Sequence, residues 1–169
     1  MKIDAEFLTG HLRFTRWASD RMLQAARALT KEELHRYLYS SYPSVHATLL
    51  HIFRSDRIWL SRVTAKPISP TEPGEESLTL DALEQKWHAV HDQFIAWASA
   101  LSQQQIDGDL DYVNMKGEAH TLAIWQIVLH VVNHGSYHRG QLTTMLRQLA
   151  HVPPNTDLST YYLSLRKRS

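Results

Sequence analysis

The segment HVVNHGSYHRGQL, residues 130–142, has a histidine at every fourth position: His130, His134 and His138. Residues four apart are neighbours on one face of a helix, so two of these imidazoles can reach the same ion. At about 100° per residue, the centre of the buried face lies within about 20° of His138 and about 60° of His134. His130 lies about 100° away, towards the rim. The pattern predicts a metal-binding pair, His134 and His138, with His130 as an outer neighbour or a solvent-facing residue.

The histidine pattern also fits a purely structural role, in which the side chains are hydrogen-bonded at a contact between two helices. A single histidine on an apolar face favours that role. Two histidines one helical turn apart and directed into a core are as consistent with a metal, because neutral imidazole is the commonest metal ligand. The sequence alone leaves both interpretations open.

A third histidine comes from a second predicted helix, at residues 44–64. On a helical wheel His51 lies about 90° from the centre of the buried face, whereas His46 lies much nearer the exposed side. His51 is therefore the better candidate for a third ligand. Together with His134 and His138 it would leave a fourth position for water or substrate, which is the pattern of catalytic rather than structural zinc.

The fold class follows from four long amphipathic segments, at residues 4–29, 44–64, 80–104 and 122–150. Residues 66–77 contain three prolines and a glycine and are predicted to form a loop. Four such helices predict an all-α fold, a four-helix bundle, over a single domain of residues 1–169.

The third of these helices shows the bundle pattern most clearly. Its apolar residues are spaced 4-3-4-3-4, at Leu83, Trp87, Val90, Phe94, Trp97 and Leu101. Two histidines, His88 and His91, flank this stripe and are predicted to lie at the surface or rim.

Three shorter features surround the last helix. Residues 107–121 predict a short hairpin or extended segment, and Thr121 is the expected N-cap of the helix that follows. Gly135 lies in the middle of that helix, where glycine costs about 1 kcal/mol relative to alanine. Close packing, room for a ligand, or chance would explain it. Residues 156–166 predict a short terminal turn.

Composition excludes several classes of protein. The net charge of +1 over 169 residues, with basic residues clustered only at 166–168, gives no reason to expect a nucleic-acid partner. The absence of cysteine excludes a disulfide scaffold and a thiolate zinc site. Because no apolar run approaches the length of a membrane span and no signal peptide is expected, the prediction is a cytoplasmic protein with no membrane partner.

Several motifs together resemble the DinB branch of the DinB/YfiT-like metalloprotein superfamily. The resemblance spans nearly the whole length, and Ser19 is a departure from it, since the family often has asparagine there. The motifs that carry it are Arg16-Trp17-Ala18, residues 44–51 leading to Asp56 and Trp59, residues 130–141, and residues 153–157.

The resemblance implies a four-helix bundle with one divalent metal, zinc or nickel, held at the positions of His51, His134 and His138. It also implies frequent homodimers. Characterised relatives in the wider superfamily include transferases and isomerases that use low-molecular-weight thiols such as bacillithiol or mycothiol.

Three functions are therefore considered. The first is a metal-dependent enzyme such as a thiol-dependent S-transferase, in which the metal lowers the pKa of a bound thiol that attacks a small electrophile. The second is a non-catalytic metal or small-molecule binding stress protein. The third, a metal-dependent hydrolase or nuclease, is disfavoured by the near-zero net charge.

Few catalytic helpers accompany the histidines. Tyr137 and Arg139 both turn away from the buried centre on the wheel, so structural roles are predicted for them. Asp56 or Gln141 could hydrogen-bond a ligand histidine and fix its tautomer. No catalytic residue is identified from the sequence.

Overall fold

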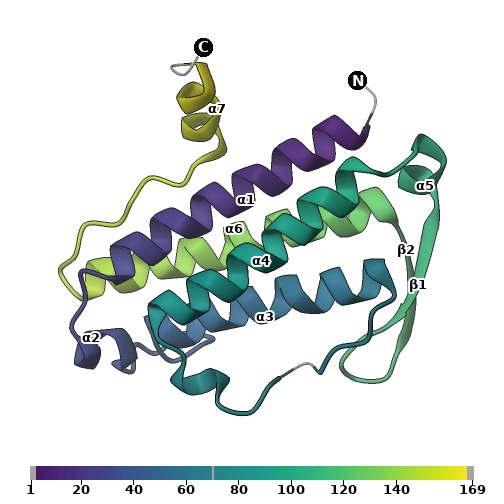
Figure 1. The fold of residues 1–169 in the computed structure, drawn as a ribbon. Helices are drawn as coiled ribbons and strands as arrows, with labels where there is room; N and C mark the ends of the chain where they lie inside the picture. Colours follow the sequence, from purple (N-terminus) through teal and green to yellow (C-terminus); the bar gives the residue numbers. More distant parts are fainter. Residues whose placement is uncertain (1–2, 70, 167–169) are drawn as a thin grey trace.

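The computed structural model describes residues 3–69 and 71–166 and confirms the predicted all-α fold. Four long helices pack side by side as a bundle (Figure 1): α1 (Ala5–Ala26), α3 (Val45–Thr64), α4 (Leu80–Ser99) and α6 (Ile124–Gln148). Helix α1 packs against α4 and α6, and α3 packs against the same two helices. Helices α1 and α3 are therefore diagonal partners, and any side chain that points inward from either one meets α4 and α6.

Most helix starts follow the local capping chemistry that the sequence contains. The side chains of Asp4, Ser44 and Thr79 each accept a hydrogen bond from a backbone N–H in the first turn of α1, α3 and α4. Such caps satisfy amide groups that have no partner inside the helix. The helix boundaries consequently agree with the predicted ones to within a few residues at these three starts.

The start of α6 differs from the prediction. Strand β2 (Ala119–Ala123) pairs antiparallel with β1 (Asp109–Val113), so the hairpin continues two residues beyond Thr121. Thr121 is therefore a strand residue, and its hydroxyl donates to Asp111 Oδ1 instead of capping a helix. The backbone N–H of Ala123 donates to the Gln126 side chain, and α6 begins at Ile124.

Short helices appear where longer or no helices were predicted. The third predicted helix ends at Ser99, and α5 (Gln103–Asp107) follows it as a separate turn. Helix α2 (Lys31–His35) was not predicted, although Thr30 and Glu33 form a capping box at its start. The terminal segment forms α7 (Leu158–Arg166), which packs on α1 through Phe14, Trp17 and Tyr161.

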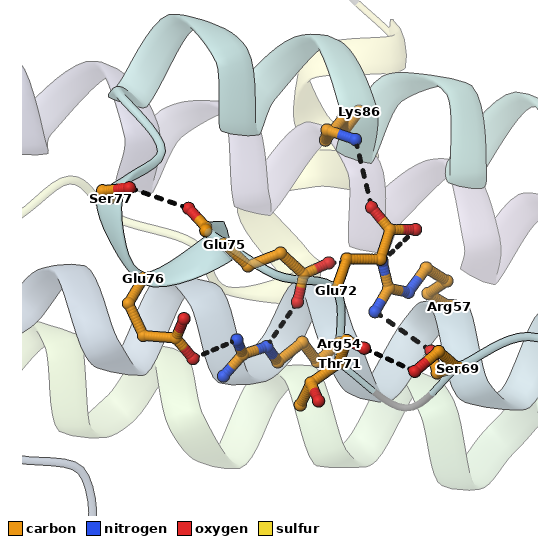
Figure 2. A network of polar contacts seen from close by, with 10 residues as sticks. Arg54, Arg57, Ser69, Thr71, Glu72, Glu75, Glu76, Ser77 and Lys86 are labelled. Atoms are coloured by element: carbon orange, nitrogen blue, oxygen red, sulfur yellow. Dashed lines mark hydrogen bonds and ion pairs between the residues drawn. The ribbon is translucent and has the colours of Figure 1, made fainter.

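The long loop between α3 and α4 runs back along the bundle, because both helices run in the same direction (Figure 1). Glu75, in the short 3-10 helix η1 (Glu75–Ser77), is buried and forms ion pairs with Arg54 and Arg57 of α3. Figure 2 shows how neighbouring carboxylates extend this network, with Glu76 on Arg54 and Glu72 on Arg57. The loop is thus fastened along the outer side of α3.

This loop corrects the prediction for His46. The wheel placed His46 near the exposed side of its helix, but its side chain is buried and its Nε2 lies 2.8 Å from the carbonyl oxygen of Leu78. A helical wheel considers one helix alone, whereas here the returning loop covers the face that the wheel leaves open.

None of the helices in the described residues combines the length and apolar character needed to cross a membrane.

Candidate metal centre

Helices α3 and α6 bring His51, His134 and His138 together. Nε2 of His51 lies 3.0 Å from Nε2 of His134 and 3.1 Å from Nε2 of His138. One nitrogen from each ring lies within 4.8 Å of the other two. The two α6 histidines occupy consecutive turns, as the HxxxH spacing predicts, and the third comes from the neighbouring helix.

Two of the three rings, His51 and His134, have lowered pKa values. Burial is the largest cause that lowers the pKa of His51 to about 3, and the charges of His134, His138 and Arg54 lower it further. Burial followed by the charge of His138 lowers the pKa of His134 to about 4, although the Asp56 carboxylate opposes the shift. At neutral pH these two imidazoles are therefore uncharged, which is the protonation state that metal coordination requires.

Two consecutive hydrogen bonds between side chains orient His138. Its Nδ1–H donates to Oε1 of Gln141 over 2.8 Å, and the Gln141 amide donates in turn to the Ser41 hydroxyl over 3.3 Å. A proton on Nδ1 leaves the lone pair on Nε2, which faces the other two histidines. Of the two residues that the sequence offers for this purpose, Gln141 and Asp56, Gln141 is the one in direct hydrogen-bond contact with a ring of the cluster.

Tyr42 covers the cluster and was missed by the sequence prediction. Its ring stacks on His51 with centroids 3.8 Å apart and meets the edge of His138 at 5.5 Å. It lies in the loop just before α3, where no periodicity marks the direction of a side chain. Tyr137 is exposed, as predicted, and its ring centroid is 5.1 Å from that of His138.

His130 lies outside the cluster. It is exposed, its ring meets the edge of Trp59 at 5.1 Å, and its centroid is 5.9 Å from that of His134. This position agrees with the predicted outer or solvent-facing role.

The donor set fits a divalent metal ion. In a tetrahedral zinc site, nitrogen ligands at 2.0–2.1 Å from the ion lie about 3.3 Å from one another. The two nitrogen–nitrogen distances from His51 are close to that value. The Nε2 atoms of the three rings face one another, and with the proton of each ring on Nδ1 they present three lone pairs and no proton to the space between them. The residues present therefore suit a cation better than they suit a contact among themselves.

Comparison with known proteins identifies the family. A model described as DinB family matches residues 5–166. The chain belongs to the DinB family. It is also similar to protein DinB of Bacillus subtilis (strain 168), with 27% identity over 150 residues that cover 86% of this chain and 87% of that protein. The resemblance found in the sequence is thereby confirmed, while the metal and the reaction have to be argued from the site.

Within this DinB-family bundle, Gly135 makes room for an arginine. A Cβ atom at this position would lie 2.7 Å from Nη1 of Arg139. The Arg139 guanidinium is buried over the ring of Phe14, and its Nη2 donates to the Ser136 hydroxyl. Arg139 has a structural role, as predicted, but it points into the bundle rather than away from it.

His91 corrects a further prediction for this chain. It is buried, its ring stacks on Trp87, and its Nε2 lies 3.3 Å from Oδ2 of Asp56. Since His91 follows Trp87 by four residues and precedes Phe94 by three, it belongs to the apolar stripe rather than to its flank. The spacing was present in the sequence and should have indicated burial.

A second group of potential ligands lies between α1 and α4. Asp20, Glu84 and His88 each offer an atom within 4.8 Å of the others. His88 Nε2–H donates to Asp20 over 2.7 Å, and Glu84 is paired with Arg27 over 2.8 Å. This group satisfies its own hydrogen bonds and charges.

Proposed function

We propose that this DinB-family protein binds one divalent metal ion, zinc or nickel, through His51, His134 and His138. The observation that carries the proposal is the convergence of three imidazole nitrogens, two of them 3.0 and 3.1 Å from the third. Imidazole suits both ions, and three protein ligands leave a further position for a substrate.

We further propose that the site serves a thiol-dependent S-transferase reaction. When bound, the metal would act as a Lewis acid that lowers the pKa of a low-molecular-weight thiol at its open position. The thiol proton leaves to solvent, the sulfur forms a bond to carbon of a small electrophile, and the leaving group departs with the bonding electron pair. The chain contains no cysteine that would compete as a thiol ligand.

The roles of the surrounding residues follow from their contacts. Gln141 holds His138 with Nε2 directed at the site. Tyr42 covers His51 and limits the access of water on that side. The exposed ring of Tyr137 also lies against His138 and offers an apolar surface to a substrate.

Cobalt substitution tests this proposal, because Co²⁺ reports its ligands through its visible spectrum. We expect low-molecular-weight thiols to change that spectrum, and an electrophile to be consumed faster when protein, metal and thiol are all present. A protein that holds its metal but shows no spectral change with any thiol would contradict the transferase proposal. Metal-activated water would then be the remaining enzymatic option.

A non-catalytic metal or small-molecule binding protein is the second candidate. One observation favours it: among the described residues, no carboxylate or lysine forms a hydrogen bond or ion pair with the three rings. A reaction that needs a general acid or base would lack one there. Thiol ligation without turnover across a broad panel of electrophiles would favour this candidate.

We also propose a homodimer, as the family resemblance implies. Trp59 and Trp87 are buried and the other three tryptophans are half-buried, so tryptophan supplies no fully exposed surface for the contact. The exposed side chains of α7, Tyr162, Leu163 and Leu165, offer an apolar surface instead. A monomer in light scattering at micromolar concentration would contradict the proposal.

A further inference from the structure

A layer of polar side chains crosses the centre of the bundle, with members on all four long helices. Each of these side chains is almost fully buried: Thr15 and Ser19 of α1, Asp56 of α3, His91 of α4 and Arg139 of α6. Buried polar atoms are nearly always hydrogen-bonded, to protein or to ordered water. Within residues 3–69 and 71–166, the buried atoms with no hydrogen-bond partner in the protein include Thr15 Oγ1, Ser19 Oγ, Asp56 Oδ1, His91 Nδ1, His134 Nδ1 and Arg139 Nη1.

The contacts between helices place these residues at one level. Helices α1 and α4 run antiparallel, with Arg16 paired to Asp92 and Asp20 paired to His88. Ser19 is therefore level with the turn that carries His91. From α3, Asp56 reaches the same turn of α4, where its Oδ2 accepts a 2.8 Å hydrogen bond from Trp87 Nε1.

Asp56 is the one acidic member of this layer. Its Oδ2 accepts from Trp87 and lies 3.3 Å from His91 Nε2, whereas its Oδ1 is buried without a hydrogen-bond partner among the described residues. Its charge reaches α6: the carboxylate acts to raise the pKa of both His134 and Arg139 against the stronger lowering by burial. The second oxygen of Asp56 is therefore an unused acceptor close to α6.

His134 has a buried ring nitrogen without a hydrogen-bond partner among the described residues. Its Nε2 faces His51, and its Nδ1, at the other side of the ring, is buried and lacks a partner among the described residues. If Nε2 is to carry the lone pair, Nδ1 must carry the proton. A protonated Nδ1 buried at this position needs an acceptor.

We propose that Asp56 is a positioning residue for His134, whose Nδ1–H is hydrogen-bonded to the unused Asp56 oxygen through an ordered water. The inference rests on the proposed metal site and names the group that prepares it. Gln141 gives His138 the same support by direct contact. Such outer hydrogen bonds fix the tautomer and raise the basicity of a ligand histidine.

A purely structural role for Asp56, as the acceptor for Trp87, has to be distinguished from positioning. Asp56→Asn makes the distinction because it keeps the size of the side chain and one carbonyl oxygen. That oxygen can still accept from Trp87, so the amide NH₂ group then faces the water that leads to His134. The hydrogen-bond direction is reversed on that side only. Trp87→Phe is the matched control, since it removes the indole N–H and leaves the carboxylate.

The first measurement uses the metal-free protein, in which long-range ¹H–¹⁵N NMR identifies the protonated nitrogen of each histidine. We expect His134 of the unaltered chain to carry its proton on Nδ1, to lose this preference in Asp56→Asn, and to keep it in Trp87→Phe. A proton on Nε2 of His134 in the unaltered chain would overturn the proposal without the need for any variant to fold.

The second measurement is zinc affinity, by competition with a chromophoric chelator. We expect Asp56→Asn to weaken zinc binding roughly 10- to 100-fold, the usual loss for an outer partner of a ligand histidine, and Trp87→Phe to leave it nearly unchanged. Equal losses in both variants, or none in Asp56→Asn, would overturn the proposal. An unaltered chain that binds no zinc would instead refute the proposed function, while the tautomer of His134 would still decide the role of Asp56.

Discussion

The part of the chain that the structure describes contains two groups of side chains that could be mistaken for one another. One is the cluster of His51, His134 and His138 between α3 and α6, and the other is the group of Asp20, Glu84 and His88 between α1 and α4. In both groups, one potential ligand atom from each residue lies within 4.8 Å of the other two. They differ in what surrounds the atoms, and that difference separates a metal site from an ion-pair network.

The α1–α4 group is balanced by its neighbours. Arg27 forms ion pairs with Glu84 and Asp81, and its guanidinium lowers the pKa of Glu84 through their hydrogen bond. His88 Nε2–H donates a hydrogen bond to Asp20. In the three-histidine cluster the Nε2 atoms face one another, and burial keeps His51 and His134 uncharged at neutral pH. Proximity alone is therefore a poor criterion for a metal site. A better criterion is a set of converging ligand atoms that no cationic side chain already pairs with.

The largest expected effect comes from removing a ligand. His134→Ala or His138→Ala should abolish stoichiometric metal in protein purified without an affinity tag, as measured by elemental analysis. His88→Ala, in the other group, should leave the metal content unchanged, and so should His130→Ala. Metal that is lost with His130 but retained without His134 would contradict the assignment of the inward face.

Acid should destabilise the metal-free protein through the three-histidine cluster. Unfolded histidines take up protons below about pH 6.5, whereas folded His51 and His134 resist protonation until the pH reaches about 3 and 4. The unfolded state therefore binds more protons within that window, and stability should fall as the pH drops from about 6.5 towards 4. Urea midpoints measured across the window test this, and His51→Gln should flatten the dependence.

The same lowered pKa values sharpen the expectation for metal binding. Protons compete with a metal only when they can bind the ligands. Between pH 7.5 and about 5, zinc affinity should fall less steeply than it would for histidines with an ordinary pKa near 6.5. A steep loss beginning at about pH 6.5, measured by chelator competition in folded protein, would contradict the burial that the structure gives to these rings.

A smaller effect is expected from Gln141→Ala. Loss of the acceptor for His138 Nδ1–H should weaken metal binding roughly tenfold or somewhat more. Ser41→Ala is the control, because it removes only the far end of the chain of hydrogen bonds. Equal zinc affinities for the two variants would mean that Gln141 does not hold the tautomer of His138.

The smallest effect is expected from a change in the group of Asp20, Glu84 and His88. Arg27→Met removes the cation that balances Glu84, at a stability cost of about 0.2–1 kcal/mol for exposed ion pairs. The Asp20, Glu84 and His88 group should then gain weak affinity for zinc, visible as a second binding event in calorimetry. Absence of any second event would show that charge balance is not what excludes metal there.

The sequence predicted the elements that depend on periodicity. The four long helices and the pairing of His134 with His138 follow from spacing along a single helix, and spacing is visible in one chain. The choice of His51 over His46 was also consistent with the structure, although for an incomplete reason, because His46 is buried rather than exposed.

Features that depend on other elements could not be predicted in this way. Tyr42 reaches His51 from an irregular loop, and the loop that buries His46 is held by ion pairs between residues far apart in the sequence. The missed helix α2 and the burial of His91 are different cases. The capping box at Thr30 and Glu33, and the position of His91 between Trp87 and Phe94, were both local signals.

The origin of the ligands on two helices has a consequence for the lifetime of the fold. His51 and His134 are 83 residues apart in the chain, and no cysteine is available to join α3 to α6 covalently. An ion held between them would act as a reversible cross-link. At a metal concentration one hundred times the dissociation constant, it would add about 2.7 kcal/mol to the stability of the closed bundle. The supply of metal would then govern how often α3 and α6 separate, and with that the resistance of the protein to proteolysis.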